Sequence, residues 1–323
     1  MDDTKLERLL ASDEAPVDSA AGLRRFRESV GTRAIGGYTA PARRRWTQAL
    51  AAAAAVAALF AGLQLTGVAD SFLTIFQPKQ VAPISIGAGD LAGLPDLSEF
   101  GTLAITTQPA SRQAATLALA RTETGLPALG AGTLPPGVTG DPRIYTVSRG
   151  EGTFRFDETK LQASAGRVSR TPPPMPANIA ASTLNVSGGP AIVQTYGGSF
   201  DPKAMSSGNV PTLLIAQSKA PVIRSDGASF DELRAYMLSQ PGISPQLAAQ
   251  IRAIGDPGQT LLVPIPMDLA SGKSVTVRDV RGVFVGDSTG LGSAVVWVID
   301  GVVNVVAGTL AEMELLAVAD SLR

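Results

Sequence analysis

The chain has 323 residues, including 27 Lys or Arg and 28 Asp or Glu, but no cysteine and no histidine. The missing side chains exclude disulfides, thiolate nucleophiles, Cys-based zinc sites and the commonest general base. A net charge of -1 argues against a nucleic-acid surface, and 45% apolar with only 17% charged residues indicates a folded core rather than disorder.

The first 45 residues form a tail with two short apolar stripes at helical spacing. The stripes consist of Leu6, Leu9, Leu10, Leu23 and Phe26. Each stretch is too short to be a stable helix on its own. Two interpretations stay open: a partly disordered basic tail attracted to anionic lipid, or a tail that folds onto a cytoplasmic protein partner.

A run of 23 residues without charge, Trp46 to Val68, follows this tail. A helix of that length is roughly 34 Å long and can cross a hydrocarbon core of about 30 Å. Arg43, Arg44 and Arg45 precede the run and place the N-terminus in the cytoplasm, with Trp46 at the interface. We therefore predict a single-pass membrane protein in which residues 46–68 are a signal anchor.

Two alternatives to a membrane anchor remain. Three arginines before an apolar run are also typical of a cleaved twin-arginine signal peptide, although the tail and the run are both longer than usual for one. A buried core helix is the other alternative, but such a helix normally has a polar face. Alanine dominates the run, which weakens its insertion signal.

The residues after the apolar run are predicted to be a juxtamembrane tether, over 69–96. Phe72 to Phe76 suggest a continuation of the helix or an interfacial segment. The glycine-rich run 87–93 is interpreted as flexible, because its glycine spacing does not fit a dinucleotide loop and no βαβ pattern surrounds it.

Residues 97–323 are predicted to form an extracytoplasmic α+β domain that begins with mixed elements. A helix is expected over 111–124, with Gly125 as its C-cap. Strands are expected at 144–147, 152–156, 191–195 and 212–216. Pro172 to Pro176 are either a surface loop or a linker between domains.

The second half of this domain has clearer signals for where helices and turns begin. A capping box at Ser229 and Glu232 begins one helix, Ser244-Pro245 begins a second, and together they predict a helical hairpin. Strands are expected at 283–285, 294–299 and 302–306, and the Asp300-Gly301 turn between the last two makes an antiparallel hairpin.

A final helix is predicted to begin at a capping box formed by Thr309 and Glu312. The residues expected to face the sheet are Leu310, Met313, Leu316, Ala317 and Leu322. Because the strands are apolar on both faces, we expect helices on one side of the sheet and another layer on the other.

The motif Gly286-Asp287-Ser288-Thr289-Gly290 has the spacing of a nucleophile elbow. Without histidine no base is evident, and a further strand rather than a helix follows, so we interpret it as a glycine-rich loop. A Ser-Lys pair with Lys273 or Lys219 remains formally open. Asp226, Asp231, Glu232, Asp256 and Asp268 are interpreted as caps and turn residues.

The turns Gly-Leu-Pro at 125–127 and Leu-Pro-Pro-Gly at 134–137, with the ending from Val295 to Leu322, carry a family resemblance. Residues 97–323 resemble a little-characterised extracytoplasmic domain of bacterial single-pass, anti-sigma-factor-like membrane proteins. The resemblance implies an envelope sensor or regulator rather than an enzyme. Many anti-sigma factors carry a zinc-binding His and Cys motif in the inner domain, which this chain lacks.

The sequence therefore predicts no enzyme activity, no cofactor and no nucleic-acid partner. It predicts a bitopic protein whose outer domain binds an unknown envelope ligand while the tail holds a cytoplasmic partner such as a sigma factor. An anchored binding or envelope-assembly module without a signalling role is the alternative. A hydrolase that uses Ser288 is the third hypothesis.

Overall fold

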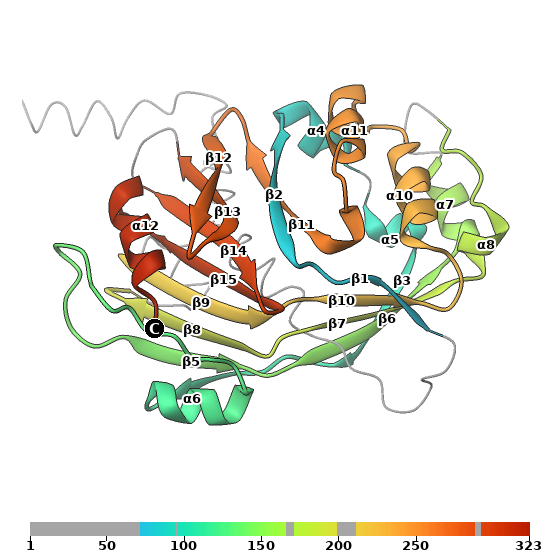
Figure 1. The fold of residues 1–323 in the computed structure, drawn as a ribbon. Helices are drawn as coiled ribbons and strands as arrows, with labels where there is room; N and C mark the ends of the chain where they lie inside the picture. Colours follow the sequence, from blue (N-terminus) through green and yellow to red (C-terminus); the bar gives the residue numbers. More distant parts are fainter. Residues whose placement is uncertain (1–71, 95, 166–170, 199–210, 288–291) are drawn as a thin grey trace, which may run out of the picture. The chain divides into compact units, whose positions relative to one another are not determined.

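Two antiparallel sheets and one parallel strand pair organise the part of the chain that the structure describes (Figure 1). This computed structural model describes residues 72–94, 96–165, 171–198, 211–287 and 292–323. The larger sheet has eight strands, the smaller antiparallel sheet has five, and helices pack against both. The α+β class with antiparallel sheets is thus confirmed for these residues, which all belong to one compact unit.

The strands are β1 (Leu73–Phe76), β2 (Gln80–Ile86), β3 (Gly101–Thr107), β4 (Ser111–Ala114), β5 (Arg143–Val147), β6 (Gly150–Phe156), β7 (Thr183–Gly188), β8 (Ala191–Tyr196), β9 (Leu213–Lys219), β10 (Val222–Ser225), β11 (Thr260–Pro266), β12 (Ala270–Val277), β13 (Val280–Asp287), β14 (Ser293–Ile299) and β15 (Val302–Gly308). The helices are α4 (Ala88–Gly93), α5 (Leu97–Phe100), α6 (Leu117–Thr124), α7 (Glu158–Ala165), α8 (Ala177–Ala180), α10 (Phe230–Leu238), α11 (Pro245–Arg252), α12 (Glu312–Ser321) and the short 3-10 helix η1 (Pro257–Gln259).

Four segments of the chain pass from one antiparallel sheet into the other. The pairs β3–β4, β5–β6, β7–β8 and β9–β10 each place one strand in either sheet, in the orders β1-β10-β7-β6-β3 and β12-β13-β14-β15-β9-β8-β5-β4. Pro109, Pro190 and Pro221 lie at three of the four joints. Proline has no N–H to donate, so each of these residues interrupts the strand ladder where the sheets separate.

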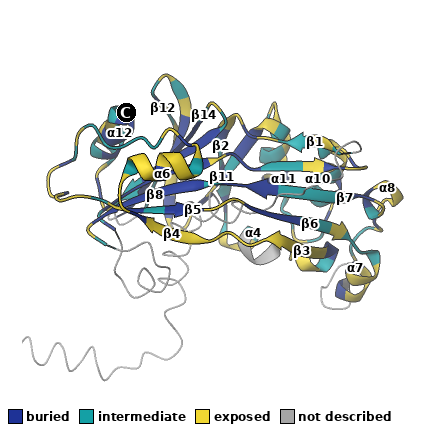
Figure 2. Ribbon diagram, turned by 90° about the horizontal axis from the view of Figure 1, so that it is seen from below, coloured by how far each residue is buried: buried dark blue, intermediate teal, exposed yellow. Residues whose placement is uncertain are grey.

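The eight-stranded sheet is covered on both faces, as its doubly apolar strands predicted. On one face α12 packs against a cluster around Trp297, which has 0% exposure, and α6 packs farther along the same face. On the other face lies the two-stranded sheet of β2 and β11, which α11 covers in turn. All six residues of the interior strand β8 are buried, whereas β4 at the edge is mostly exposed (Figure 2).

The tether predicted over 69–96 is corrected for the residues that the structure describes. β1 pairs with β10 in antiparallel register, and β2 pairs with β11 in parallel register over seven residues. Apolar side chains on both faces of β2 suit its position between two layers. Val81 faces the eight-stranded sheet, while Ile84 and Ile86 face α11. The glycine-rich run forms α4, where the Asp90 carboxylate accepts a hydrogen bond from Gly87 N.

Helices α5, α7, α8 and α10 pack around a third core cluster beside the five-stranded sheet. The proline-rich residues join α7 to α8 within this region, and Met175 is buried there. The Tyr236 hydroxyl donates to the Pro173 carbonyl at 3.3 Å. The proline-rich stretch is therefore a loop within one fold, and the linker interpretation is wrong.

Predictions from local signals are confirmed at both hairpins. Ser229 Oγ accepts from Glu232 N while the Glu232 carboxylate accepts from Ser229 N, and Ser244 caps α11 with Pro245 in the first turn. At the strand hairpin Asp300 and Gly301 both have positive φ, 52° and 70°, as a type I′ turn requires. These features depend on neighbours in sequence, so the local order of residues suffices to predict them.

Two predicted helix boundaries are wrong. Ser111 to Ala114 form β4, paired with β5, so α6 begins only after its N-cap at Thr116. The last helix begins after Ala311, whose N–H donates to Glu314, rather than at the Thr309 and Glu312 box. Gly125 does end α6, with φ 67°.

The face of α12 that packs on the sheet agrees with the prediction at Leu310 and Leu322, and in part at Leu316, but not at Met313 and Ala317. The residues buried there are Leu315, Val318, Ala319 and Leu322, with Leu310 just before the helix. Met313 is 84% exposed, and Ala317 is exposed as well. The spacing of the buried set is a regular helical stripe, but its phase is set by how the helix lies on the sheet.

No helix in the described ranges is both long enough and apolar enough to cross a membrane. The predicted span at residues 46–68 lies outside those ranges, so the anchor remains a prediction. Phe72 to Phe76, which we expected to continue a helix or to form an interfacial segment, include the strand β1 instead.

Candidate functional site

The residues that the sequence singled out for partner binding and membrane orientation lie outside the described ranges. They are Leu6, Leu9, Leu10, Leu23, Phe26, Arg43, Arg44, Arg45 and Trp46. Their roles therefore remain predictions. Candidate sites in the described domain have to be sought among other residues.

The elbow-like motif is placed only in part. Gly286 and Asp287 end β13, and its antiparallel partner β14 follows, as expected for a loop between two strands; Ser288 lies outside the described residues. Lys273 is engaged elsewhere, because its Nζ pairs with Glu312 at 2.9 Å.

The carboxylates interpreted as structural have structural partners in several cases. Asp226 accepts a hydrogen bond from Thr183 N, and Asp268 accepts one from Ala88 N. Hydrogen bonds from Ser229 hold the pKa of Glu232 below its usual range. Across the described ranges, no group of three or more acidic side chains is placed to hold a metal ion.

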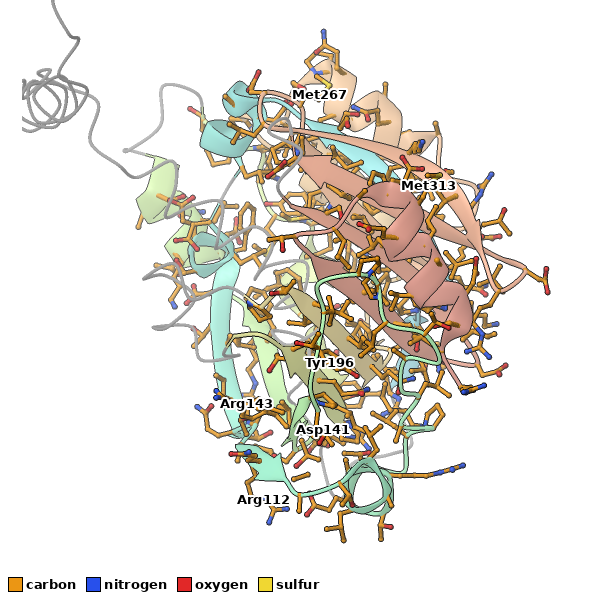
Figure 3. All side chains as sticks on the ribbon, turned by 90° about the vertical axis from the view of Figure 1, so that its left-hand side faces the viewer. Arg112, Asp141, Arg143, Tyr196, Met267 and Met313 are labelled. Carbon is orange, nitrogen blue, oxygen red and sulfur yellow. The ribbon has the colours of Figure 1, made fainter. Side chains whose placement is uncertain are left out.

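A cleft of about 370 Å³ lies at one end of the eight-stranded sheet, where β5 begins and β8 ends. We name it the β5–β8 cleft; it is lined by Asp141, Arg143, Thr195, Gly197 and Gly198. Arg143 and Thr195 are direct partners on the two antiparallel strands, so their side chains lie on the same face of the sheet. Figure 3 shows Asp141, Arg143 and Tyr196 gathered at this end of the sheet, with Arg112 on the neighbouring strand.

Thr195 carries a polar atom with no evident use in the fold. The residue is 1% exposed, and its hydroxyl has no hydrogen-bond partner among the described residues. A buried polar group left in this state costs about 1–3 kcal/mol. The next wall residue, Gly197, has φ 70°, and a Cβ there would come within 2.6 Å of Thr212 Oγ1. Both the positive φ and the nearness of Thr212 therefore require glycine at position 197.

The two charged residues of the cleft have opposite signs and stay available to a ligand. Asp141 and Arg143 are both exposed, and within the described ranges neither takes part in an ion pair.

Burial raises the pKa of the Tyr196 phenol, and the negative charge of Asp141 raises it further. Tyr196 therefore remains a neutral hydroxyl at physiological pH.

A second hollow, of about 510 Å³, lies where α10 begins and α11 ends. Its charged residues are Asp231, Arg234, Arg252 and Asp256. Arg234 is already paired with Asp231 at 2.9 Å, which leaves less charge for a ligand. One wall residue, Phe230, stacks on Phe76 of β1 at a centroid distance of 5.9 Å. This hollow is better suited to supporting β1 than to recognising a ligand.

The described residues of the β5–β8 cleft offer charged and polar groups at its surface. It combines a cation, an anion and a buried hydroxyl, and its described residues include no nucleophile paired with a general base. Sequence reasoning missed these residues because 52 positions separate Arg143 from Thr195 and only strand pairing joins them. The residues Gly140-Asp141-Pro142 are typical of a turn, but they do not indicate which distant strand will lie beside Arg143.

Glu151 is a buried carboxylate away from the cleft, at the joint between the two sheets. Its side chain is 2% exposed, and its Oε1 lies 3.5 Å from Arg149 Nε. Burial raises the pKa of Glu151 above the ordinary 4.5, and Arg149 opposes this shift only in part. In the window just above pH 4.5 the folded chain therefore binds more protons than the unfolded chain.

We accordingly expect the free energy of unfolding to fall as pH rises from 4.5 through the raised pKa of Glu151. Glu151→Gln should flatten this part of the profile, measured by urea unfolding between about pH 4 and pH 7. Glu158→Gln, which removes a half-buried carboxylate at the start of α7, is the matched control. An unchanged slope in Glu151→Gln would show that the carboxylate does not titrate in this window.

Comparison of the chain with models of known protein families gives no match, and comparison with curated proteins gives none either. Its function is therefore inferred from the residues of the cleft and from the order of its parts.

Proposed function

We propose that this chain is a single-pass envelope sensor or regulator of the anti-sigma-factor type. Residues 46–68 cross the membrane, the domain that follows binds a ligand outside the cytoplasm, and residues 1–45 bind a cytoplasmic protein such as a sigma factor. The arginines at 43–45 and the uncharged run after them support this orientation.

The observation that carries the proposal is the small number of residues between the apolar run and the first strand of the sheet. β1 begins at Leu73, with only four residues between it and Val68. It is hydrogen bonded to β10, and the residues just after it are fixed by bonds from Gln77 N to Gly258 O and from Lys79 N to Gln259 O. At most four residues are therefore available to absorb a displacement of the domain before it reaches the proposed span.

Topology is tested first, using the absence of native cysteine. Ser19→Cys places one thiol in the tail, and Ser111→Cys places one on the exposed strand β4. We expect a membrane-impermeant maleimide to label Ser111→Cys in intact cells and Ser19→Cys only after permeabilisation. Equal labelling of both in intact cells, or of neither, would contradict the proposed orientation.

The tail is tested by co-purification of the full chain from membranes. Leu9→Asp combined with Phe26→Asp puts charge into both apolar stripes, whereas Ser12→Asp combined with Thr32→Asp adds the same charge outside them. We expect the first double variant to reduce recovery of a cytoplasmic partner at least about tenfold and the control to leave it unchanged, because buried apolar anchors dominate such interfaces. Equal recovery in all forms would favour the anchored binding module without signalling.

A further inference from the structure

We infer that this chain pairs with a second copy of itself through β3, edge to edge, so that the five-stranded sheets of the two copies continue into one another. The two-fold axis passes between the two Ala104 residues. Three properties of β3 support this pairing: its open edge, its self-complementary sequence and the direction of its backbone groups. The inference goes beyond the proposed function and does not depend on it.

β3 is an edge strand without the usual protection. Among the described residues it pairs with β6 alone, and Figure 2 shows it following β4 along one margin of the sheets. Edge strands are normally protected by charge or by being short. β4 carries Arg112, β12 carries Lys273, and β1 has only four residues. β3 has seven residues, and no charged residue occurs between Glu99 and Arg112, so its edge is open to another strand.

Two apolar side chains of β3 are exposed on one face of the sheet. Leu103 is 53% exposed and Ile105 is 52% exposed, and the alternation of a strand puts both on the same side. Phe154 of β6 lies directly opposite Leu103 and packs against the third core cluster, whereas Gly152, opposite Ile105, has no side chain to cover it. The apolar face of this sheet therefore extends past the core to its edge.

The sequence of β3 is self-complementary for antiparallel pairing. Residues 102–106 are Thr-Leu-Ala-Ile-Thr, which has the same pattern in both directions about Ala104. When two copies pair about that residue, Leu103 of each lies opposite Ile105 of the other, and four apolar side chains meet on one face. A two-fold axis requires one patch that is complementary to itself. An unrelated strand would not require this symmetry, so the pattern favours a second copy as the occupant.

The hydrogen-bonding pattern of β3 agrees with this axis. Asp157 N donates to Phe100 O at 2.9 Å, and these two residues are opposite each other in the register of β3 and β6. Because hydrogen-bonded and non-hydrogen-bonded pairs alternate, the backbone groups of Ala104 point to β6, whereas those of Leu103 and Ile105 point to the open edge. The residues that would exchange backbone hydrogen bonds with a second copy are therefore the two that the pairing about Ala104 requires.

Lys160 of α7 limits the contact at one end of β3. Its Nζ donates to Gly101 O at 3.1 Å and to Thr102 Oγ1 at 2.8 Å, so this end of the edge is occupied. The contact is thus confined to residues 102–106, far fewer than the roughly 20–30 residues a side of a standard interface. We expect a weak, reversible dimer, which is best detected by trapping it covalently.

The absence of native cysteine allows the axis to be located by cross-linking the full chain in membranes. In Ala104→Cys the two Cα atoms of a non-hydrogen-bonded pair are about 4.5 Å apart, within the range that a disulfide spans. In Thr107→Cys, on the same exposed strand, they are about 20 Å apart along the strands. Mild oxidation should give at least about tenfold more dimer in Ala104→Cys. No dimer in Ala104→Cys, or equal yields in both variants, would overturn the inference.

Two lysine substitutions in the Ala104→Cys background separate pairing from random collision. Ile105→Lys should lower the yield of dimer about tenfold, because it brings a positive charge from each copy into the contact. Leu119→Lys is the matched control and should leave the yield unchanged. Leu119 is also 52% exposed, but it lies on α6, which packs on the eight-stranded sheet. Equal yields with both lysines would mean that collision alone forms the disulfide, which contradicts the inference.

Leu103→Pro tests the backbone pairing itself. The Leu103 N–H points to the open edge, so proline leaves the ladder with β6 intact and removes a donor that the second copy needs. In the Ala104→Cys background the yield of dimer should fall about tenfold with Leu103→Pro and remain with Leu103→Val, which keeps the N–H. Equal yields with proline and valine, or a disulfide to a different protein in place of the dimer, would overturn the choice of a second copy.

Discussion

Leu315→Ala is expected to lower the free energy of unfolding by about 3 kcal/mol, because it leaves a cavity where α12 meets the sheet. Leu315 has 0% exposure and packs in the cluster with Trp297 and Val306. A truncated leucine loses its transfer free energy, and neighbours held by strand pairing can collapse only in part to fill the space. Urea unfolding of the full chain measures the difference.

Met313→Ala is the matched control for this prediction. Met313 lies on the same helix two residues earlier but is 84% exposed, so its truncation should change the free energy of unfolding by less than about 0.5 kcal/mol. The pair tests the orientation of α12 directly, since the helical pattern alone assigned Met313 to the sheet. Similar losses in both variants would contradict the orientation described here.

Gly308→Ala is expected to have an effect of similar size, a loss of about 3 kcal/mol from overpacking. Gly308 is the last residue of β15 and pairs with Leu213 of β9. A methyl group on it would overlap the carbonyl oxygen of Thr212, which is backbone and cannot rotate away as a side chain could. Thr212 also accepts from Thr309 N at 3.0 Å, so a shift would disturb the end of the ladder.

Gly308→Ala should also disturb the wall of the β5–β8 cleft, because Thr212 also borders Gly197. Gly255→Ala is the control, since a Cβ at Gly255 meets nothing within 4 Å. Chemical unfolding is measured on both variants. Wild-type stability in Gly308→Ala would show that β9 and β15 can separate locally at little cost.

The β2–β11 pair illustrates which parts of the fold could not be predicted from the sequence. Its register joins Gln80 to Thr260, 180 positions apart, and the Gln80 amide donates to the Thr260 hydroxyl at 3.0 Å. The apolar alternation of β2 was present in the sequence. It was interpreted as a tether because no neighbouring strand was available to pair with it.

β4 shows a related limit. Ser111 to Ala114 have a composition that suits a helix, yet they pair with β5 at the edge of the sheet. Intrinsic preference is weak beside the hydrogen bonds that an adjacent strand offers. The cleft was missed for the same reason, because Arg143 and Thr195 become neighbours only through the ladder of β5 and β8.

The sequence by itself determined the features that depend on local order. These are the caps at Ser229 and Ser244, the turn at Asp300-Gly301, the absence of thiol and imidazole chemistry, and the uncharged run that predicts a membrane anchor. Only the tertiary structure decided that β1 is part of the sheet, which face of α12 is buried, and that Asp141, Arg143 and Thr195 share one cleft. Caps and turns form between residues a few positions apart, whereas these contacts join distant segments whose pairing the whole core selects.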